Sequence, residues 1–369
     1  MIIPLELWML IAYELQVQRN RESLLSLCLT TKSINADFTP ILYSQVELRA
    51  ASSVLSFYHT MKDSGTKLGP LIQGITIGSY RHVRHWDRVH IGFDLAKILQ
   101  SALMSLPNLR ELTSVMDPDG FRACFINERN TDTGTDTPVN FPFSLHKLVL
   151  PTMHRTSVPL FFSSQPSIKE LYIESEGLHG NIYITGFLSR SSGCLPNLTS
   201  ITARTYELTG AVPGRPISQI MIVTEMLERS GEIIVTQGQW MRVLQGSTVP
   251  ITTIGFYRPP RSHDLWDQLI PALKQFGVDK TLESIRVVEA LEPPVTEESR
   301  QEALFRRVNQ MKILTGFDRL ESIEFGEMLY ATLPTTDVLR WLGNMGDLNA
   351  WKEFVPSLKQ VKMYGVYIS

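Results

Sequence analysis

The chain has 369 residues, of which 43% are hydrophobic and 20% charged, with a formal net charge of −2. This composition is that of an ordinary globular protein, long enough for a small domain plus a large one or for a repeat array. The near-neutral charge argues against binding to nucleic acid or to an anionic membrane surface. Cys28, Cys124 and Cys194 are too far apart for a disulfide framework or a zinc motif. We therefore expect a reducing compartment, cytoplasmic or nuclear or both, and neither a metal nor another cofactor.

The apolar N-terminus lacks the features of a secretory signal peptide. No Lys or Arg precedes the apolar stretch, and Pro4, Glu6 and Glu14 interrupt it. No run elsewhere approaches the ~18 uninterrupted apolar residues that a membrane-spanning helix needs. We expect neither a signal peptide nor a transmembrane helix.

Residues 4–15 form the first predicted helix. Pro4 suits the first turn, where its missing N–H has no intrahelical partner, and no glycine follows within the segment. Only Glu6 and Glu14 are charged, so the helix is apolar on almost every side. A surface helix normally carries one apolar stripe, and this one must therefore be covered on more than one side.

Two further helical segments, residues 23–32 and 33–43, follow a polar break. The apolar residues of the first again cover more than one face, and those of the second end near Pro40. Three short helices in about 45 residues cannot bury this much apolar surface among themselves. Part of it is expected to face another protein or the following domain.

The three segments match a known motif in order and spacing. They read Pro4-Leu5-Glu6-Leu7-Trp8-x-x-Ile11, then Leu24-Leu25-Ser26-Leu27-x-Leu29-Thr30-x-Lys32, then Pro40-x-Leu42-Tyr43. Over residues 2–45 they resemble the F-box, in the form found in large families of fungal F-box proteins. Thr31 departs mildly from the pattern, since relatives often have Cys or Val there.

The resemblance implies a module, residues 1–45, that docks on a small Skp-type adaptor and through it on a cullin. The residues that it implies at the adaptor surface are Ile3, Pro4, Leu5, Leu7, Trp8, Ile11, Leu24, Leu25 and Leu29. The alternative is that the three helices only cap the array that follows, since repeat arrays need caps.

Residues 46–369 form the predicted array, and the pattern apolar-x-x-apolar-x-apolar recurs along it, starting at Tyr43. Its period-2 end predicts a short strand with one buried face. The copies begin at Tyr43, Ile72, Leu145, Ile168, Leu198, Ile217, Ile251, Leu282, Leu320 and Leu358, with a partial copy at Leu109 that has Ser114 in its third position.

Helix-like stretches separate the predicted strands, at residues 53–61, 93–104, 262–276 and 297–311 and near Val338. Gly65 is expected to end the first, and Ser262 and Thr296 to cap the third and fourth. Pro271 should kink or split the third helix, and Gly277 should stop it. One strand and one helix every 20–40 or so residues is typical of a solenoid.

The array resembles an irregular leucine-rich-repeat array. That consensus has Asn or Cys three residues after the last apolar position; here those places hold Met153, Glu176, Tyr206, Pro259, Ala290, Met328 and Val366. The predicted fold class is α/β, a three-helix F-box-like module followed by a leucine-rich-repeat-like solenoid of alternating helices and short parallel strands. A doubly wound α/β sheet is the alternative. Residues 116–142 and 289–296 are predicted to be a polar insert and a shorter loop.

Candidate sites for chemistry are few. Three histidines in residues 81–90, His82, His85 and His90, share the segment with three arginines, which favours a solvated loop over a metal site. A basic patch for an acidic partner or RNA is a second interpretation of this segment. Gly74-x-Thr76-x-Gly78 fits a repeat strand better than a nucleophile elbow. The candidate binding aromatics, each of which can equally be core, are Trp86, Trp240, Phe256, Tyr257, Trp341 and Trp351.

The sequence therefore predicts a non-catalytic substrate-recognition subunit of a Skp–cullin–F-box ubiquitin ligase. The F-box-like module would bind the adaptor, and the array would bind a protein substrate that the sequence does not identify. A repeat-array scaffold acting outside ubiquitination is the alternative, and an enzyme is a third hypothesis that no motif supports.

Overall fold

The computed structural model describes residues 5–17, 20–82, 85–87, 89–127, 136–150, 157–173, 188–189, 191, 193–223, 236–257, 264–289, 298, 301–302, 305, 308–309, 312–327 and 335–368. The chain divides into two compact units, residues 1–81 with 86–168, and residues 82–85 with 169–369. The predicted boundary at residue 45 lies inside the first unit and stays a prediction.

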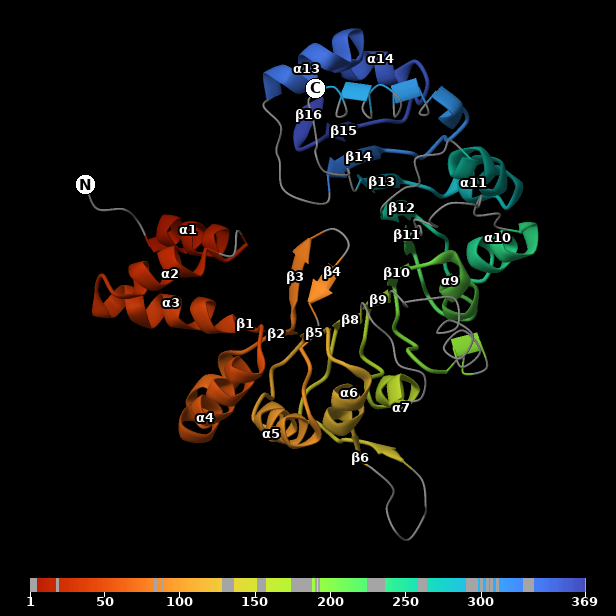
Figure 1. The fold of residues 1–369 in the computed structure, drawn as a ribbon. Coiled ribbons are helices and arrows are strands. Elements are labelled where there is room, and N and C mark those ends of the chain that lie inside the picture. Colours follow the sequence, from red (N-terminus) through yellow and green to blue (C-terminus); the bar gives the residue numbers. More distant parts are fainter. Residues whose placement is uncertain are drawn as a thin grey trace. The chain divides into compact units, whose positions relative to one another are not determined.

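The N-terminal module consists of three helices, as predicted (Figure 1). They are α1 (Leu5–Val17), α2 (Arg21–Cys28) and α3 (Lys32–Ser44). Side chains cap the second and third helices: Asn20 Oδ1 accepts from the Ser23 amide at 3.2 Å, and Thr31 Oγ1 accepts from the Ile34 amide at 3.1 Å. These caps satisfy amides that have no partner within their own helix.

In the first unit, each strand is added beside the one before it. The parallel order is β1 (Gln45–Leu48), β2 (Gly74–Ile77), β5 (Glu111–Ser114) and β8 (Lys147–Leu150). Between them come α4 (Ala51–Leu68), η1 (Gly69–Leu71), α5 (Phe93–Leu103) and α6 (Pro118–Phe125), and α7 (Ser157–Ser164) follows. Two small hairpins pair β3 (Ser79–His82) with β4 (His85–Asp87), and β6 (Ile126–Asn127) with β7 (Thr137–Pro138).

The second unit continues the same scheme. Its parallel strands are β9 (Glu170–Ile173), β10 (Ser200–Ala203), β11 (Gln219–Val223), β12 (Thr253–Tyr257), β13 (Ser284–Glu289), β14 (Ser322–Glu327) and β15 (Gln360–Met363), in that order. The helices are α9 (Thr205–Ala211), α10 (Gln237–Leu244), α11 (Asp264–Gln275), α13 (Thr335–Leu342) and α14 (Leu348–Lys352), with short turns η2 (Val278–Lys280), η3 (Lys312–Leu314) and η4 (Gly343–Gly346).

A hairpin closes the second unit, because β16 (Val366–Ile368) runs antiparallel to β15. Tyr364 and Gly365 form its two-residue turn with φ angles of 46° and 89°. Positive φ at both central residues is the requirement of the turn type that best matches strand twist.

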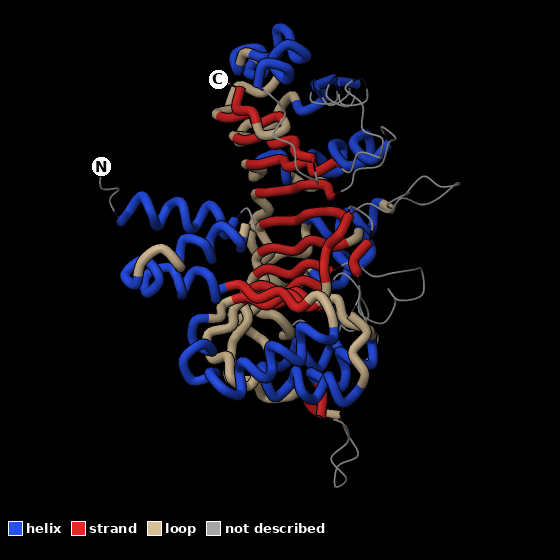
Figure 2. Tube along the Cα trace, turned by 60° about the vertical axis from the view of Figure 1, so that its left-hand side comes forward, coloured by secondary structure: helices blue, strands red, loops and turns tan. Residues whose placement is uncertain are grey.

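Each copy of the predicted strand pattern coincides with one of the parallel strands. Figure 2 draws the strands in red. In β8, Leu148 and Leu150 are 0% and 1% exposed, whereas Lys147 is exposed and Val149 partly so. One face of each unit's sheet is therefore covered and the other is open. A doubly wound sheet would bury both faces, so this alternative is wrong and the predicted strand–helix solenoid is confirmed.

At four junctions between described repeats, a hydroxyl group that precedes the strand bonds to the preceding repeat, and we call these four bonds the hydroxyl ladder. Each hydroxyl donates to the carbonyl oxygen of the first apolar residue in the preceding repeat. The pairs are Ser167 to Leu145, Ser247 to Ile217, Thr281 to Ile251 and Ser357 to Leu320, at 2.7 or 2.8 Å. Such bonds satisfy strand-start carbonyls that would otherwise be buried without a partner. In the leucine-rich-repeat consensus, the Asn position follows the strand. Here the side chains that link the repeats lie before the strand instead.

The predicted polar insert at residues 116–142 is wrong as an account of the whole segment. Asp117 Oδ1 accepts from the Gly120 amide at 2.8 Å and Pro118 follows it, so the acidic, proline-containing stretch is the start of α6. Phe121 and Phe125 are buried against Phe161, with ring centroids 5.7 and 4.8 Å apart. Residues 128–135 lie outside the described part.

Other helix predictions are confirmed or corrected in detail. Gly65 does not end α4; it is buried within the helix, where an added Cβ would lie 3.3 Å from Met61 Cε. Pro271 lies inside α11 without splitting it, and Gly277 follows with φ of 76° as a helix stop should. Ser262 and Thr296 are outside the described residues, and residues 297–311 are described only in part.

The cysteines are free and buried, and burial raises the pKa of the Cys124 thiol well above its usual range. Among the described helices, none is both long enough and apolar enough to cross a membrane.

Arg215 is the largest polar side chain in the interior, with 0% exposure. Its guanidinium donates to the carbonyl oxygens of Leu188, Ser191, Cys194 and Ala211 at 2.8–3.0 Å. One side chain thus holds Leu188, Ser191 and Cys194 against the end of α9. Burial lowers the pKa of Arg215, but an arginine starts so high that the group stays charged.

We predict that Arg215→Met lowers the free energy of unfolding of the second unit by about 3 kcal/mol or more, because several buried carbonyl groups lose their donor. Urea denaturation followed by circular dichroism measures the change. The exposed Arg242→Met is the control and should change stability by less than about 0.5 kcal/mol. Equal effects of the two substitutions would contradict this account.

Candidate functional site

The N-terminal three-helix module has a hydrophobic core of its own. Six residues form that core: Ala12, Leu24, Cys28, Phe38, Ile41 and Leu42. Trp8, Met9, Leu15, Leu27, Ile34 and Tyr43 pack around them. Each helix contributes to the core, so the three helices form a packed unit and not a loose extension.

Apolar side chains nevertheless remain on the outside of this module. The exposed fractions are 50% for Leu7, 64% for Leu10 and 41% for Ile11 on α1, and 48% for Leu25 and 74% for Leu29 at α2. Spacings of three and four residues put each group on one side of its helix. We call these five residues the exposed apolar face. One exposed leucine is ordinary, whereas five on two packed helices are typical of an interface.

Four residues that the resemblance assigned to adaptor binding lie on the exposed apolar face: Leu7, Ile11, Leu25 and Leu29. Leu24 is only 3% exposed and Trp8 packs beside it, so these two support the module's interior. The backbone of Leu5 is in α1, but its side chain, like Ile3 and Pro4, lies outside what the structure describes.

The motif did not single out Leu10, which is the most exposed apolar residue of α1. The helical spacing of Leu10 from Leu7 could have placed Leu10 on the same side of the helix. Residues 7, 10, 11 and 14 share one side of a helix, turned by about a third of a turn from the side that carries Trp8, Ala12 and Leu15.

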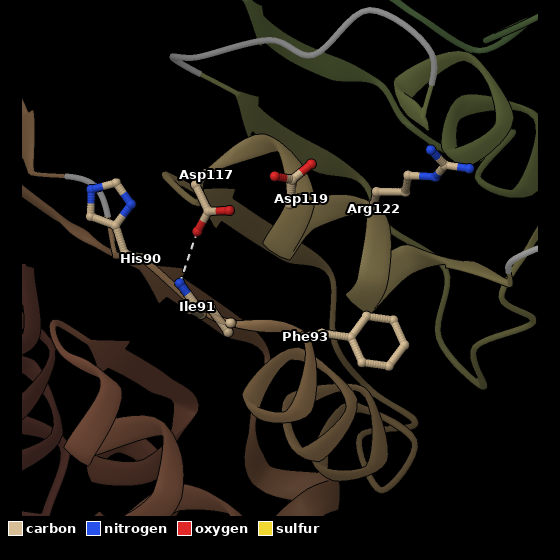
Figure 3. A pocket seen from close by; sticks show the side chains of 7 residues that line it. His90, Ile91, Phe93, Asp117, Asp119 and Arg122 are labelled. Atoms are coloured by element: carbon tan, nitrogen blue, oxygen red, sulfur yellow. Dashed lines mark hydrogen bonds between the residues drawn. The ribbon is translucent and has the colours of Figure 1, made fainter.

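A second feature is a pocket of about 500 Å³ in the first unit. Its lining residues are His90, Ile91, Gly92, Phe93, Asp117, Asp119 and Arg122 (Figure 3). They come from the start of α5 and the start of α6. Asp117 joins the two segments, because its carboxylate accepts from the amides of Ile91 and Gly120, both at 2.8 Å.

The other polar groups of the pocket differ in their surroundings. Arg122 pairs with Asp136 at 2.8 Å, and in Figure 3 its guanidinium lies away from Asp117 and Asp119. Asp119 is exposed in the first turn of α6, and Phe93 is 54% exposed at the first turn of α5. The pocket thus combines a carboxylate and an aromatic ring, both open to solvent.

Among the remaining candidates, those that the structure describes do not come together as a further site. Trp240, Phe256 and Trp351 are buried, so they serve the core. Within the described ranges, no three His, Cys, Asp or Glu side chains are grouped as metal ligands would be. His82, His85 and Trp86 fall among residues whose side chains are not described.

Comparison with known proteins adds little to this picture. No family model and no curated protein matches the chain. A leucine-rich repeat-containing protein from Legionella pneumophila is 10% identical over 88% of this chain and 92% of that one, with a TM-score of 0.43. A protein from Bacteroides fragilis is 11% identical over 87% of this chain and 65% of that one, with a TM-score of 0.30. The fold assignment therefore rests on the strand order and burial pattern.

We predict that Leu10→Lys changes the free energy of unfolding by less than about 0.5 kcal/mol, because this side chain is already largely in water. Leu24→Ala, in the core of the same module, should cost about 2–5 kcal/mol. Thermal unfolding of both variants measures the contrast. A large loss of stability for Leu10→Lys would show that the exposed apolar face is covered by the chain itself.

Proposed function

We propose that this protein is a non-catalytic substrate-recognition subunit of a Skp–cullin–F-box ubiquitin ligase. The exposed apolar face is the observation that carries the proposal. It lies on a module whose core is already closed, so the exposed leucines and isoleucine do not serve the module's own folding. The motif blocks of residues 2–45 supply the choice of a Skp-type adaptor as partner.

The energetics of this surface suit a protein partner. Fully burying one leucine side chain stabilises a complex by roughly 1.5–3 kcal/mol, and the five residues are already partly covered. Roughly 1 kcal/mol from each would give about 5 kcal/mol before association costs. Specific binding therefore needs further contacts, which the resemblance expects at Ile3, Pro4 and Leu5.

The array supplies the proposed substrate-binding part. Its parallel strands leave one face of each sheet open, and a row of adjacent strands offers a continuous surface for a protein ligand. In this proposal the chain contributes neither a catalytic residue nor a cofactor, and the ubiquitin-transfer chemistry belongs to its partners.

We predict that the full chain binds a purified Skp-type adaptor and that Leu7→Lys combined with Leu10→Lys weakens binding at least about a hundredfold, because two charges would be buried at an apolar contact. Isothermal titration calorimetry measures both affinities. Leu339→Lys is the matched control, since Leu339 is 39% exposed on α13, and it should bind like the unaltered chain.

Two results would overturn the proposal: no binding by the unaltered chain, or equal binding by the double variant with its fold intact. Adaptor binding without subsequent cullin recruitment would instead support the alternative, a binding scaffold outside ubiquitination. That alternative keeps the F-box-like fold but acts outside ubiquitination, and it is also compatible with no adaptor binding at all.

A further inference from the structure

We infer that the adaptor receives α1 in an apolar groove with two walls, and that this groove covers Tyr13 in addition to the exposed apolar residues of the helix. The inference rests on the proposed function and adds the shape and chemistry that the partner's surface must have. Tyr13 lies outside the motif blocks, which end at Ile11 in this helix. Its exposed fraction is nevertheless 52%.

The side chains of α1 from Leu7 to Gln16 divide into two sets. The exposed set consists of Leu7, Leu10, Ile11, Tyr13 and Glu14. The set that faces the module consists of Trp8, Met9, Ala12, Leu15 and Gln16. In this second set Ala12 is a core residue, and the Gln16 side chain donates to the Ser44 hydroxyl at the end of α3. The two sets do not mix around the helix.

Helical geometry gives the width of each set. At about 100° per residue, the exposed set runs from Tyr13 at one border to Ile11 at the other and spans about 160°. The set that faces the module spans about 120° by the same measure, and residues from both α2 and α3 are needed to cover it. The apolar stripe that a surface helix turns to its neighbours is typically about 100° wide. An arc as wide as the exposed one therefore needs two walls, which is what a groove offers.

The chemistry of the exposed set suits such a groove. Four of its five side chains are aliphatic or aromatic. Glu14, the charged one, lies in the last turn of α1, so it stands at the end of the arc and not at its middle. Tyr13 provides a large ring with few rotatable bonds, a combination that recurs at protein interfaces. A helix laid in an apolar groove is an established way for one protein to bind another.

The test compares two single substitutions at the opposite borders of the arc, Tyr13→Lys and Ile11→Lys, in the full chain. A groove encloses both borders, so each variant should bind a purified Skp-type adaptor about tenfold more weakly or worse, because each charge would be buried against an apolar wall. Isothermal titration calorimetry measures the affinities. A flat contact would reach one border at most. If either variant binds as well as the unaltered chain, the groove is wrong.

The matched control is Tyr206→Lys, since Tyr206 is a tyrosine of α9 with an exposed fraction of 38%. It belongs to the second unit and should leave adaptor binding unchanged. Thermal unfolding of Tyr13→Lys should match that of the unaltered chain, because the side chain is already half in water. Weakened binding then reports the contact and not a loss of fold.

A second measurement leaves the docking surface unaltered. The full chain is labelled with 3-fluorotyrosine, and the fluorine signal of Tyr13 is assigned from its absence in Tyr13→Phe. In the free chain this signal should shift between light and heavy water, as that of an exposed ring does. Saturation with the adaptor should abolish the shift. A shift of unchanged size in the saturated complex would overturn the inference, whatever the affinities of the lysine variants.

Failure of the groove is distinguishable from failure of the proposed function. Weak binding by Leu7→Lys with Leu10→Lys, together with normal binding by Tyr13→Lys, would refute the groove and leave the adaptor as the partner. Absence of adaptor binding by the unaltered chain would refute both.

Discussion

The array depends on one hydrogen-bonding arrangement that recurs at the start of most of the described parallel strands. Two consecutive backbone amides donate to a single carbonyl oxygen of the preceding repeat: Glu283 and Ser284 to Thr252, at 2.8 and 3.0 Å, and then Glu321 and Ser322 to Glu283 at the same distances. This arrangement fixes the register of neighbouring strands. Register in turn decides which side chains reach the covered face, since a slip by one residue would exchange the two faces. The apolar pattern and the open face both follow from it.

The same constraint explains which parts of the fold were predictable. The apolar pattern identified each parallel strand, because every copy must fill the same space behind its sheet. Ser167, Thr281 and their counterparts were visible in the sequence, but a small hydroxyl residue carries no mark of its acceptor. Asp117 was predicted to lie in a polar insert but caps α6, for a related reason. Asp and Pro favour both a loop and a helix start, and only the buried phenylalanines that follow decide between them.

The candidate site was predictable in part. The excess of apolar residues in the first helix indicated a surface left over after folding, and the structure shows such a surface at Leu7, Leu10 and Ile11. The motif did not separate exposed from interior positions, because Leu24 and Leu25 are adjacent leucines with opposite surroundings. The pocket was not predictable at all. Phe93 and Asp119 come together only because the starts of two helices lie side by side.

The position of the hydroxyl ladder has a consequence for how this kind of protein can change over evolutionary time. All of its bonds lie just before the strands. The repeats that these bonds join therefore share the same side-chain hydrogen bond at that edge. The bonded residues Leu145 and Ser167 are 22 positions apart, whereas Leu320 and Ser357 are 37 apart. Repeats of such unequal length share one stacking pattern. Insertions and deletions between strands can therefore accumulate without disturbing the ladder, and one edge can diversify while the other is conserved.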